Sequence, residues 1–216
     1  MAVRKPGYSP KRRGNGDKKR NAVIFIKAEG KNKTETKYLR KFVNRNVQIH
    51  FAQGISTDPV NMVDELISEM KEKGFASDLG DLSFCLIDSD LAAWKNSKIY
   101  EADILAKENE ITVIVSSPCF EIWFLCHYSY STRQYGSNDE VIAELQKKMP
   151  GYSKNSNDVY ERICLETDNA IANARRLERY LLESGRTRHT VGFQPSTEMY
   201  SVIEGIRKIE KRNQNK

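Results

Sequence analysis

Two acidic clusters, each directly after a strongly apolar run, constrain this chain more than any other feature. Glu29 follows the run at residues 22–26, and Asp88 and Asp90 follow the run at residues 82–87. If the two runs are neighbouring strands of one parallel sheet, their carboxyl ends lie side by side, where open α/β sheets bind ligands. Three carboxylates then converge, and because like charges at short distance repel, the cluster needs a cation.

The predicted cation is Mg²⁺, which prefers hard oxygen ligands and supports phosphate chemistry. Bound to Asp88 and Asp90, it would polarise a phosphoryl oxygen and position a water. Glu29 would complete the metal site or serve as the acid/base group. A structural interpretation stays open beside this one, because Asp and Ser often open loops or cap helices and Glu-Gly is an ordinary strand exit.

The loop after Glu29 adds features of a phosphate site. Gly30 permits close approach of the backbone to a phosphate, Lys31 and Lys33 supply positive charge, and the N-terminus of a predicted helix opens beside them. Glu35 is a further candidate of the site. The helix dipole alone also explains an acidic residue in a first helical turn.

The chain length and composition limit the class of protein. With 216 residues, the chain has room for one α/β domain with a substantial core. No apolar run is long enough to span a bilayer and no signal-type segment stands near the start, which predicts a cytoplasmic protein without membrane contact. The four cysteines lack Cys-x-x-Cys spacing, so we expect buried reduced thiols rather than zinc ligands or disulfides.

The net charge of +6 is unevenly distributed along the chain. Residues 1–21 carry +7 and residues 207–216 carry +4, which leaves about −5 on the body between them. The Gly- and Pro-containing basic start predicts a disordered arm that tracks phosphates, and the alternative is a solvated tail without that role. The acidic body argues against a protein that coats nucleic acid in general.

Alternating apolar runs and helical periodicity predict an α/β fold with a mostly parallel, Rossmann-like sheet flanked by helices. In the first half of the chain, Thr34 is the predicted N-cap of one helix. Asp58 is the predicted N-cap of the next helix, with Pro59 at its first position, and Gly74 is predicted to end that helix. The predicted strands span residues 22–28, 48–52, 82–87 and 111–115, and a further helix spans about 97–108.

The second half predicts helices, and no further clear strand is expected beyond Val115. Residues 120–128 form an apolar helix that must be buried, and Glu121 within it needs a cation, a metal or helix-start amides; a buried salt bridge or a capping role is equally compatible. Three further helices are predicted at residues 139–149, 167–183 and 196–210. The expected domains are a basic arm (1–21), an α/β core (22–130), a C-terminal helical layer (131–210) and a basic tail (211–216).

Other common catalytic patterns are missing from the sequence. His50, His127 and His189 have no partner at metal-ligand spacing, and His127 is expected to be a packed histidine. No Gly-x-x-x-x-Gly-Lys-Ser/Thr motif occurs, which argues against ATP hydrolysis by a P-loop mechanism. A nucleophile elbow is missing as well, which argues against a Ser/His/Asp hydrolase.

The acidic motifs at the ends of the two apolar runs resemble a known pattern. Glu-Gly after one strand and Asp-x-Asp after a later one resemble the Toprim domain of topoisomerases, bacterial primases and the overcoming-lysogenization-defect nucleases. More closely, residues 28–35, 87–90 and 117–124 resemble the RloB-like family, and the Pro-Cys-Phe-Glu-x-Trp-Phe string at 118–124 is fairly specific. Further similar stretches are residues 152–154, 170–174 and 195–197, so that the similarity covers roughly residues 22–209.

The resemblance implies a bacterial Toprim-type protein of phage defence or abortive infection, encoded beside an ABC-type ATPase partner of the RloA-like kind. Such relatives are thought to be nucleases that depend on Mg²⁺ or Mn²⁺. Carried over by position, Glu29, Asp88 and Asp90 would be the metal and catalytic residues, with Glu121 and Lys154 as additional candidates. The loop at residues 30–35 is one residue longer than the family's short form, which leaves the role of Glu35 open, and the basic tail has no counterpart.

Two functions compete at this point. The first is a metal-dependent phosphodiesterase acting on DNA or RNA, favoured by the intact self-repelling carboxylates. The second is a non-catalytic Toprim-fold sensor or interaction subunit of a defence complex, favoured by the lack of an obvious basic groove. A topoisomerase or primase is less attractive, because the chain is short and lacks zinc-ribbon cysteines. The choice of nucleic acid and assembly into a homo-oligomer stay open.

Overall fold

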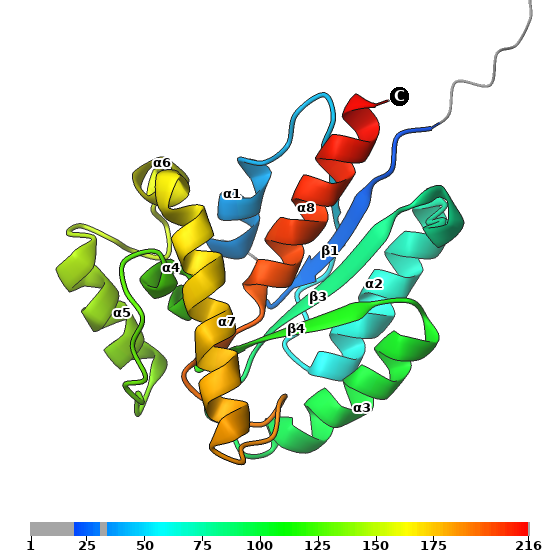
Figure 1. Cartoon of the computed structure of the whole chain (residues 1–216). Helices are drawn as coiled ribbons and strands as arrows, with labels where there is room; N and C mark the ends of the chain where they lie inside the picture. Colours follow the sequence, from blue (N-terminus) through cyan, green and yellow to red (C-terminus); the bar gives the residue numbers. More distant parts are fainter. Residues whose placement is uncertain (1–19, 31–33, 216) are drawn as a thin grey trace, which may run out of the picture.

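A five-stranded sheet runs through the centre of the molecule (Figure 1). The structure is a computed structural model, and it describes residues 20–30 and 34–215. The order across the sheet is β2-β1-β3-β4-β5; the first four strands pair in parallel and β5 pairs antiparallel with β4. This confirms the predicted α/β fold with a mostly parallel sheet. The strands are β1 (Ile24–Ala28), β2 (Ile49–Phe51), β3 (Leu82–Asp88), β4 (Thr112–Ser117) and β5 (Ser196–Thr197).

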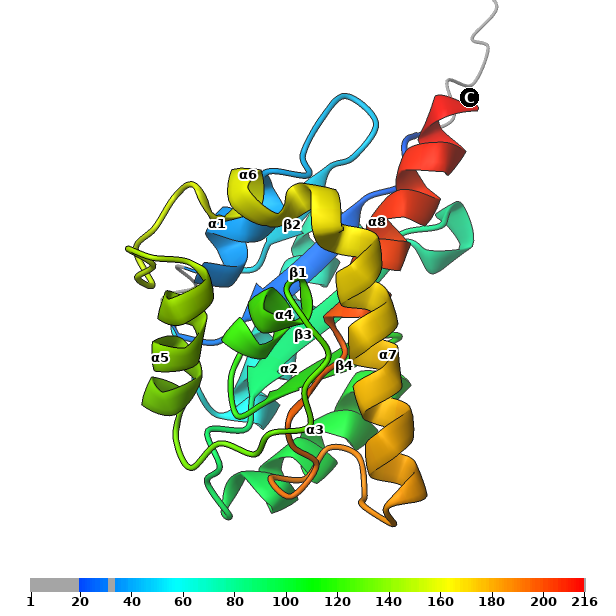
Figure 2. The same cartoon turned by 60° about the vertical axis from the view of Figure 1, so that its left-hand side comes forward.

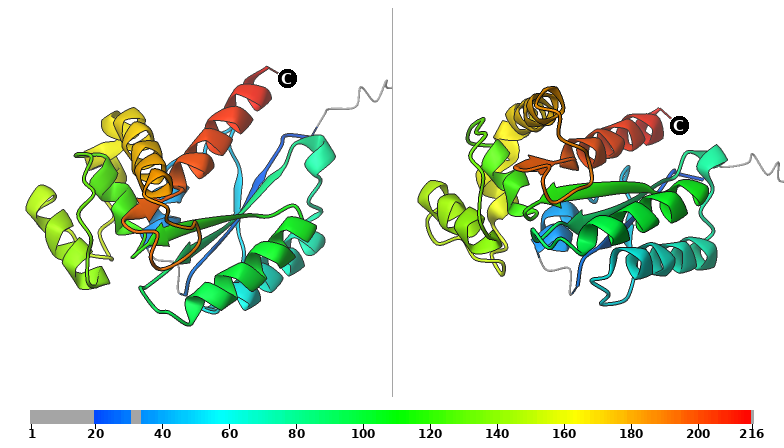
Figure 3. Two further views of the ribbon diagram at one scale, coloured as in Figure 1. Left: turned by 60° about the horizontal axis from the view of Figure 1, so that its bottom comes forward. Right: turned by 90° about the horizontal axis from the view of Figure 1, so that it is seen from below.

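Helices cover both faces of this sheet (Figure 3). On one face lie α2 (Pro59–Lys73) and α3 (Lys95–Glu108), and on the other lie α1 (Thr34–Arg40) and α8 (Met199–Gln214). The α1/α8 side is extended by further helices, with α4 packed between α5 and α7 (Figure 2). These are α4 (Glu121–Cys126), α5 (Asn138–Lys148), α6 (Val159–Ile163) and α7 (Thr167–Glu183).

Alternating side chains explain how the sheet separates two apolar layers. Ile24 and Ile26 of β1 face the core beneath α8, whereas Phe25 faces the core beneath α2 and α3. A strand buried on both faces reads as a continuous apolar run, which is the pattern of residues 22–26. Helix α8 crosses the sheet closely at Gly205, where a Cβ atom would lie 2.9 Å from the ring of Phe84. A glycine is therefore needed at this crossing.

The capping signals mark the helix ends as predicted. Asp58 Oδ1 accepts hydrogen bonds from the backbone N–H groups of Val60 and Asn61, each at 3.1 Å, and Pro59 opens α2. Gly74 ends α2 with a φ of 72°, in the left-handed region that glycine favours. Helix α7 has the predicted bounds. The first half of the chain thus folds locally as its sequence pattern indicates.

The second half differs from the prediction in its last segments. We expected no strand beyond Val115, but Ser196–Thr197 forms β5 at the sheet edge. Two small polar residues carry no apolar period, so the sequence contained no strand signal there. For the same segment we expected a helix from residue 196 to 210, whereas α8 begins at Met199 and continues to Gln214. Helix α6 was not predicted either.

Several simpler expectations concern the thiols, the membrane and the basic arm. All four cysteines are free, and Cys85, Cys119 and Cys126 are buried, as predicted. Within the part of the chain that the structure describes, no helix combines the length and the apolar character needed to span a bilayer. Almost the whole predicted basic arm, residues 1–19, lies outside the described residues.

His189 ties the loop before β5 to α3. Its Nδ1 lies 2.5 Å from Asp103 Oδ2, and its Nε2 lies 2.9 Å from Glu198 Oε2. The same Glu198 oxygen accepts the backbone N–H of Val115 at 3.0 Å. Burial disfavours the charged imidazolium, but the hydrogen bonds with Asp103 and Glu198 outweigh it and raise the pKa of His189 to about 10. A protonated histidine thus links α3, β4 and the loop before β5.

We expect His189→Gln to lower the melting temperature at neutral pH. Because folding raises the pKa of His189 from 6.5 to about 10, its contribution to stability is complete below pH 6.5 and is lost as the pH rises through 10. The difference in melting temperature between wild type and variant should therefore shrink toward pH 10 in a series of thermal melts. His50→Gln is the control, since His50 packs against the ring of Phe25. A difference for His189→Gln that stays constant with pH would contradict the prediction.

Candidate active site

The direction in which the chain winds changes between β1 and β3. From β1 the chain passes through α1 to β2, which lies on one side of β1 in the sheet. From β3 the chain passes through α3, on the other face of the sheet, to β4, which lies in the opposite direction across the sheet. Open α/β sheets bind ligands outside the carboxyl ends of their strands at such a switch point. Glu29 directly follows β1, and Asp88 is the last residue of β3. The predicted pairing of these two strand ends is confirmed by the β1–β3 ladder.

Lys95 lies between the carboxylates of Glu29 and Asp90. Its Nζ is 2.8 and 3.0 Å from the two carboxylate oxygens of Glu29 and 2.7 Å from Asp90 Oδ2. The carbonyl oxygen of Asp88 accepts a further hydrogen bond from Nζ at 2.8 Å. The side chain of Lys95 is only 2% exposed. Burial alone would lower the pKa of Lys95, but Glu29 and Asp90 raise it overall, so the ammonium stays charged.

An unusual turn directs Asp90 toward this ammonium. Asp90 and Leu91 have φ values of 50° and 54°, a region that non-glycine residues seldom adopt. The backbone N–H of Asp90 donates to the carbonyl oxygen of Pro118 at 2.9 Å, which joins the turn to the segment after β4. Asn138, at the start of α5, donates its side-chain N–H to Asp90 Oδ1 at 2.6 Å. Backbone strain of this kind is typical of functional sites.

A second group of carboxylates has fewer positive charges beside it than Glu29 and Asp90 have. This group consists of Asp88, Glu35 and Glu121. Burial raises the pKa of Asp88 well above its ordinary value, and the charges of Glu35 and Glu121 raise it further. Burial also raises the pKa of Glu35 to about 7, and repulsion by Glu121 adds to this rise. The nearby ammonium of Lys154 opposes the rise without cancelling it. These carboxylates therefore repel one another in the folded protein.

Glu121 enters the group from the buried start of α4. It is 1% exposed, and its Oε1 accepts a hydrogen bond from the hydroxyl of Tyr152 at 2.8 Å. Lys154 follows two residues later on the same loop. Burial alone would lower the pKa of Lys154, but the negative charge of Glu121 and of other carboxylates raises it overall. The loop between α5 and α6 thus brings both a hydroxyl donor and a positive charge to the site.

The site residues predicted from sequence therefore gather at one end of the sheet, apart from Lys31 and Lys33, which lie outside the described residues. Sequence analysis missed Lys95 and Asn138. The structure places Lys95 at the start of α3, where a positive charge opposes the helix dipole and so marks the residue as unusual. Our predicted start of this helix, near Ser97, left Lys95 in a loop. The predicted residues that gather are Glu29, Glu35, Asp88, Asp90, Glu121 and Lys154.

The chemistry of these side chains suits a divalent cation such as Mg²⁺ or Mn²⁺, because carboxylate oxygens are hard ligands. The mutual repulsion at Asp88 and Glu35 is what such a cation would relieve. Among the described residues, no three His, Cys, Asp or Glu side chains are arranged to hold a metal ion. The ammonium of Lys95 lies between two of the carboxylates, Glu29 and Asp90. The residues fit the cation by ligand type, and binding would require side chains to move.

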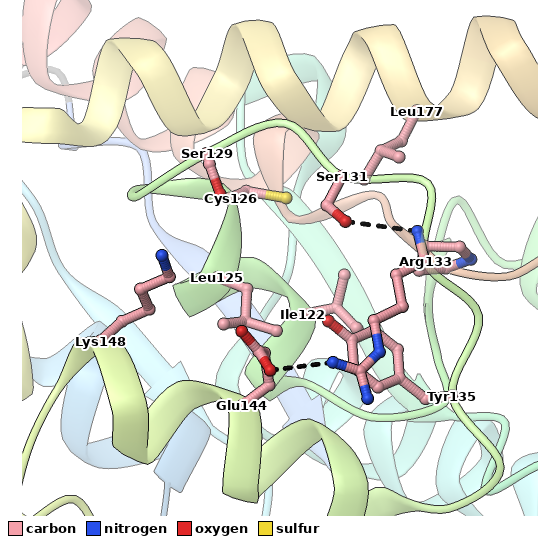
Figure 4. Close-up of a pocket in the computed structure, with 11 residues that line it drawn as sticks. Ile122, Leu125, Cys126, Ser129, Ser131, Arg133, Tyr135, Glu144, Lys148 and Leu177 are labelled. Atoms are coloured by element: carbon pink, nitrogen blue, oxygen red, sulfur yellow. Dashed lines mark hydrogen bonds and ion pairs between the residues drawn. The ribbon is translucent and has the colours of Figure 1, made fainter.

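A separate pocket is lined by α4, α5, α7 and the loop after α4 (Figure 4). Its lining includes Ile122, Leu125 and Leu177, together with Arg133, whose guanidinium lies 3.0 Å from Glu144 Oε2. Lys147 binds the same oxygen of Glu144 at 2.9 Å. None of the clustered carboxylates lines this pocket, so it is distinct from the candidate active site.

The fold and the site define an α/β protein with a charged cluster at the switch point of a parallel sheet. The model of the RloB-like protein family matches residues 24–206, from β1 into α8. The chain therefore belongs to the RloB-like protein family, as the resemblance of its motifs indicated. No curated protein matches the chain. No solved structure matches it either.

We expect Glu35→Gln to raise the melting temperature of the metal-free protein at pH 8. Because folding raises the pKa of Glu35 from 4.5 to about 7, stability falls as the pH rises through this range and the carboxylate ionises. The advantage of the variant should therefore grow from pH 4.5 to pH 8 in thermal melts with EDTA. Asp90→Asn, which removes a partner of Lys95, should instead lower the melting temperature. A Glu35→Gln variant that melts below wild type at pH 8 would count against the repulsion.

Proposed function

We propose that this protein is a metal-dependent nuclease of the Toprim type that hydrolyses phosphodiester bonds in DNA or RNA. The observation that carries the proposal is the convergence of Glu29, Asp88 and Asp90 at the switch point between β1 and β3. Glu35 and Glu121 add two more acidic groups beside them. A cluster of like charges costs stability, and a module that only binds a partner would gain little from it. The motif resemblance at these positions supports the same function.

Each group has a proposed role in the reaction. Glu29, Asp88 and Asp90 would hold the Mg²⁺ or Mn²⁺ ion, which when bound would polarise a phosphoryl oxygen and activate a water. Glu35 would act as a general acid or base; burial and neighbouring carboxylates raise its pKa to about 7 in the metal-free protein, and a bound cation would lower this pKa. Lys154 supplies a positive charge beside the carboxylates, where a phosphate group would lie.

Trp94 supports a nucleic acid as the substrate. The residue is 57% exposed, and its ring centroid lies 5.9 Å from the Nζ of Lys95, at the edge of the carboxylate cluster. Bases stack on exposed aromatic rings with about 1–3 kcal/mol per base, without a strong preference for sequence. A base presented in this way must be unpaired. The position of Trp94 therefore favours single-stranded nucleic acid, or an end or loop of a folded one.

The family resemblance leads us to propose a role in bacterial phage defence, in the cytoplasm and together with an ABC-type ATPase partner. A nuclease that acts inside its own host needs control, and an ATPase partner would supply it. One observation favours the alternative of a non-catalytic sensor or interaction subunit. Lys95 already offsets part of the negative charge of Glu29 and Asp90, so that these carboxylates have a counterion without a metal ion. Cleavage assays separate the two functions.

We expect the purified protein to cleave nucleic acid with Mg²⁺ or Mn²⁺, and we expect Asp88→Ala/Asp90→Ala to lose this activity. The assay compares single- and double-stranded DNA, total tRNA and a synthetic RNA, because the residues of the site do not indicate whether the substrate is DNA or RNA. The metal ion should also raise the melting temperature of wild type, since it relieves the repulsion around Asp88, and Asp88→Ala should abolish that rise.

The assay has a second stage, in which the ATPase partner is present. If neither the wild type nor the double mutant cleaves any substrate alone, the assay is repeated with the partner and ATP. Failure to cleave in its presence, combined with a melting temperature that no metal ion changes, would refute the nuclease and leave the sensor function.

We expect Trp94→Ala to raise the KM for a single-stranded oligonucleotide by about tenfold with little change in kcat. The expected size follows from the loss of one base stack of about 1–3 kcal/mol. Tyr100→Ala is the matched control, since Tyr100 is an aromatic residue of α3, the helix that Trp94 precedes, with 68% exposure and a place outside the cluster. Equal effects of the two substitutions would show that Trp94 makes no specific contact with the substrate.

A further inference from the structure

Lys95 is surrounded by oxygen atoms in the manner of a bound cation. Four oxygens lie within 3.0 Å of its Nζ: both carboxylate oxygens of Glu29, one of Asp90 and the carbonyl of Asp88. The side chains of Lys95 and Glu29 are 2% and 15% exposed, so water screens this contact only weakly. Carboxylate and carbonyl oxygens are also the groups that coordinate hard divalent cations in proteins.

The ammonium and a divalent ion cannot use these oxygens together. The oxygens lie 2.7 to 3.0 Å from Nζ, which is the distance of a hydrogen-bonded ammonium. Mg²⁺ requires about 2.0–2.1 Å and near-octahedral geometry, so an ion bound by both Glu29 and Asp90 would occupy the space of Nζ. One cation excludes the other at this position.

Lys27, which is also fully buried, shows how an ordinary buried ion pair differs. Its Nζ contacts one carboxylate, Glu65 Oε2 at 2.6 Å, and the carbonyl oxygens of Gln53 and Gly54. One positive charge there meets one negative charge. At Lys95, one positive charge meets the two carboxylates of Glu29 and Asp90, with Asp88 close by. The site around Lys95 therefore keeps an excess of negative charge, and the site around Lys27 does not.

The position of Lys95 in its helix also points to a specific role. It is the first residue of α3, where the positive end of the helix dipole disfavours a cation. An acidic or neutral residue would suit this position better. The contacts with the carboxylates of Glu29 and Asp90 and with the carbonyl oxygen of Asp88 compensate for the unfavourable location.

We propose that Lys95 is a built-in counterion that occupies the cation position between Glu29 and Asp90 and competes with the divalent ion for these carboxylates. The metal-free protein thus keeps its acidic residues in place, and a metal ion gains both carboxylates only when the ammonium leaves them. This inference rests on the proposed metal-dependent function and adds to it a positioning residue that sets the metal affinity.

The test is a calorimetric titration of Mn²⁺ into metal-stripped wild type, Lys95→Met and Lys95→Gln, without substrate. Removal of the competing charge should tighten Mn²⁺ binding by about tenfold or more, which corresponds to about 1.4 kcal/mol. Thermal melts provide a second measurement. Both variants should melt below wild type in EDTA and gain more than wild type from Mn²⁺, because a metal ion replaces the missing charge.

Lys27→Met is the matched control, as it removes a lysine that is also fully buried. It should also melt below wild type, but its Mn²⁺ affinity should equal that of wild type. Lys95→Gln covers the case in which Lys95→Met fails to fold, since the amide still donates hydrogen bonds without a charge. Mn²⁺ binding by the Lys95 variants that equals or is weaker than that of wild type would overturn the proposal.

Failure of this inference is distinguishable from failure of the proposed nuclease. If wild type binds Mn²⁺ and cleaves nucleic acid while the Lys95 variants bind no tighter, only the counterion proposal fails. If the Lys95 variants bind Mn²⁺ more tightly but wild type cleaves nothing with its partner present, the counterion stands and the nuclease fails. Absence of Mn²⁺ binding in all proteins refutes both.

Discussion

The ammonium group of Lys95 joins the carboxyl ends of β1 and β3, and the arrangement of the acidic residues depends on it. Glu29 follows β1 and Asp90 follows β3, and both bind the same buried Nζ. Without this charge, adjacent strand ends would carry carboxylates that repel one another in a poorly solvated place. A lysine from α3 therefore allows a parallel sheet to present several acids at its switch point.

The surrounding fold withstands the remaining repulsion because its apolar layers are extensive. Both faces of β1, β3 and β4 are buried beneath helices, and α8 approaches β3 closely at Gly205. Hydrophobic burial supplies most of the stability of such a domain, so the sheet can carry the unfavourable pKa shifts of Asp88 and Glu35 at one end. The left-handed turn at Asp90 is a second local cost, retained where it directs a carboxylate.

These costs are concentrated at the end of the sheet where the RloB-like family motifs lie. The family match spans the strands, the turn after β3 and the start of α4, which carry the carboxylates. Natural sequences depart from the most stable choice mainly at functional sites. Repelling acids, a strained turn, a lysine against a helix dipole and an exposed Trp94 in one place together support a site for a charged ligand rather than a structural cap.

The sequence by itself determined most of the elements and the candidate acids, because apolar period and capping are local properties. The strand around residues 22–28, the Asp58 cap and the Gly74 stop needed only neighbouring residues. The sequence also marked Glu29, Asp88 and Asp90, since each stands where an apolar run ends. Only the tertiary structure decided that Lys95 lies between them and that residues 196–197 complete the sheet. Those contacts join segments far apart in the chain, and packing rather than local pattern selects them.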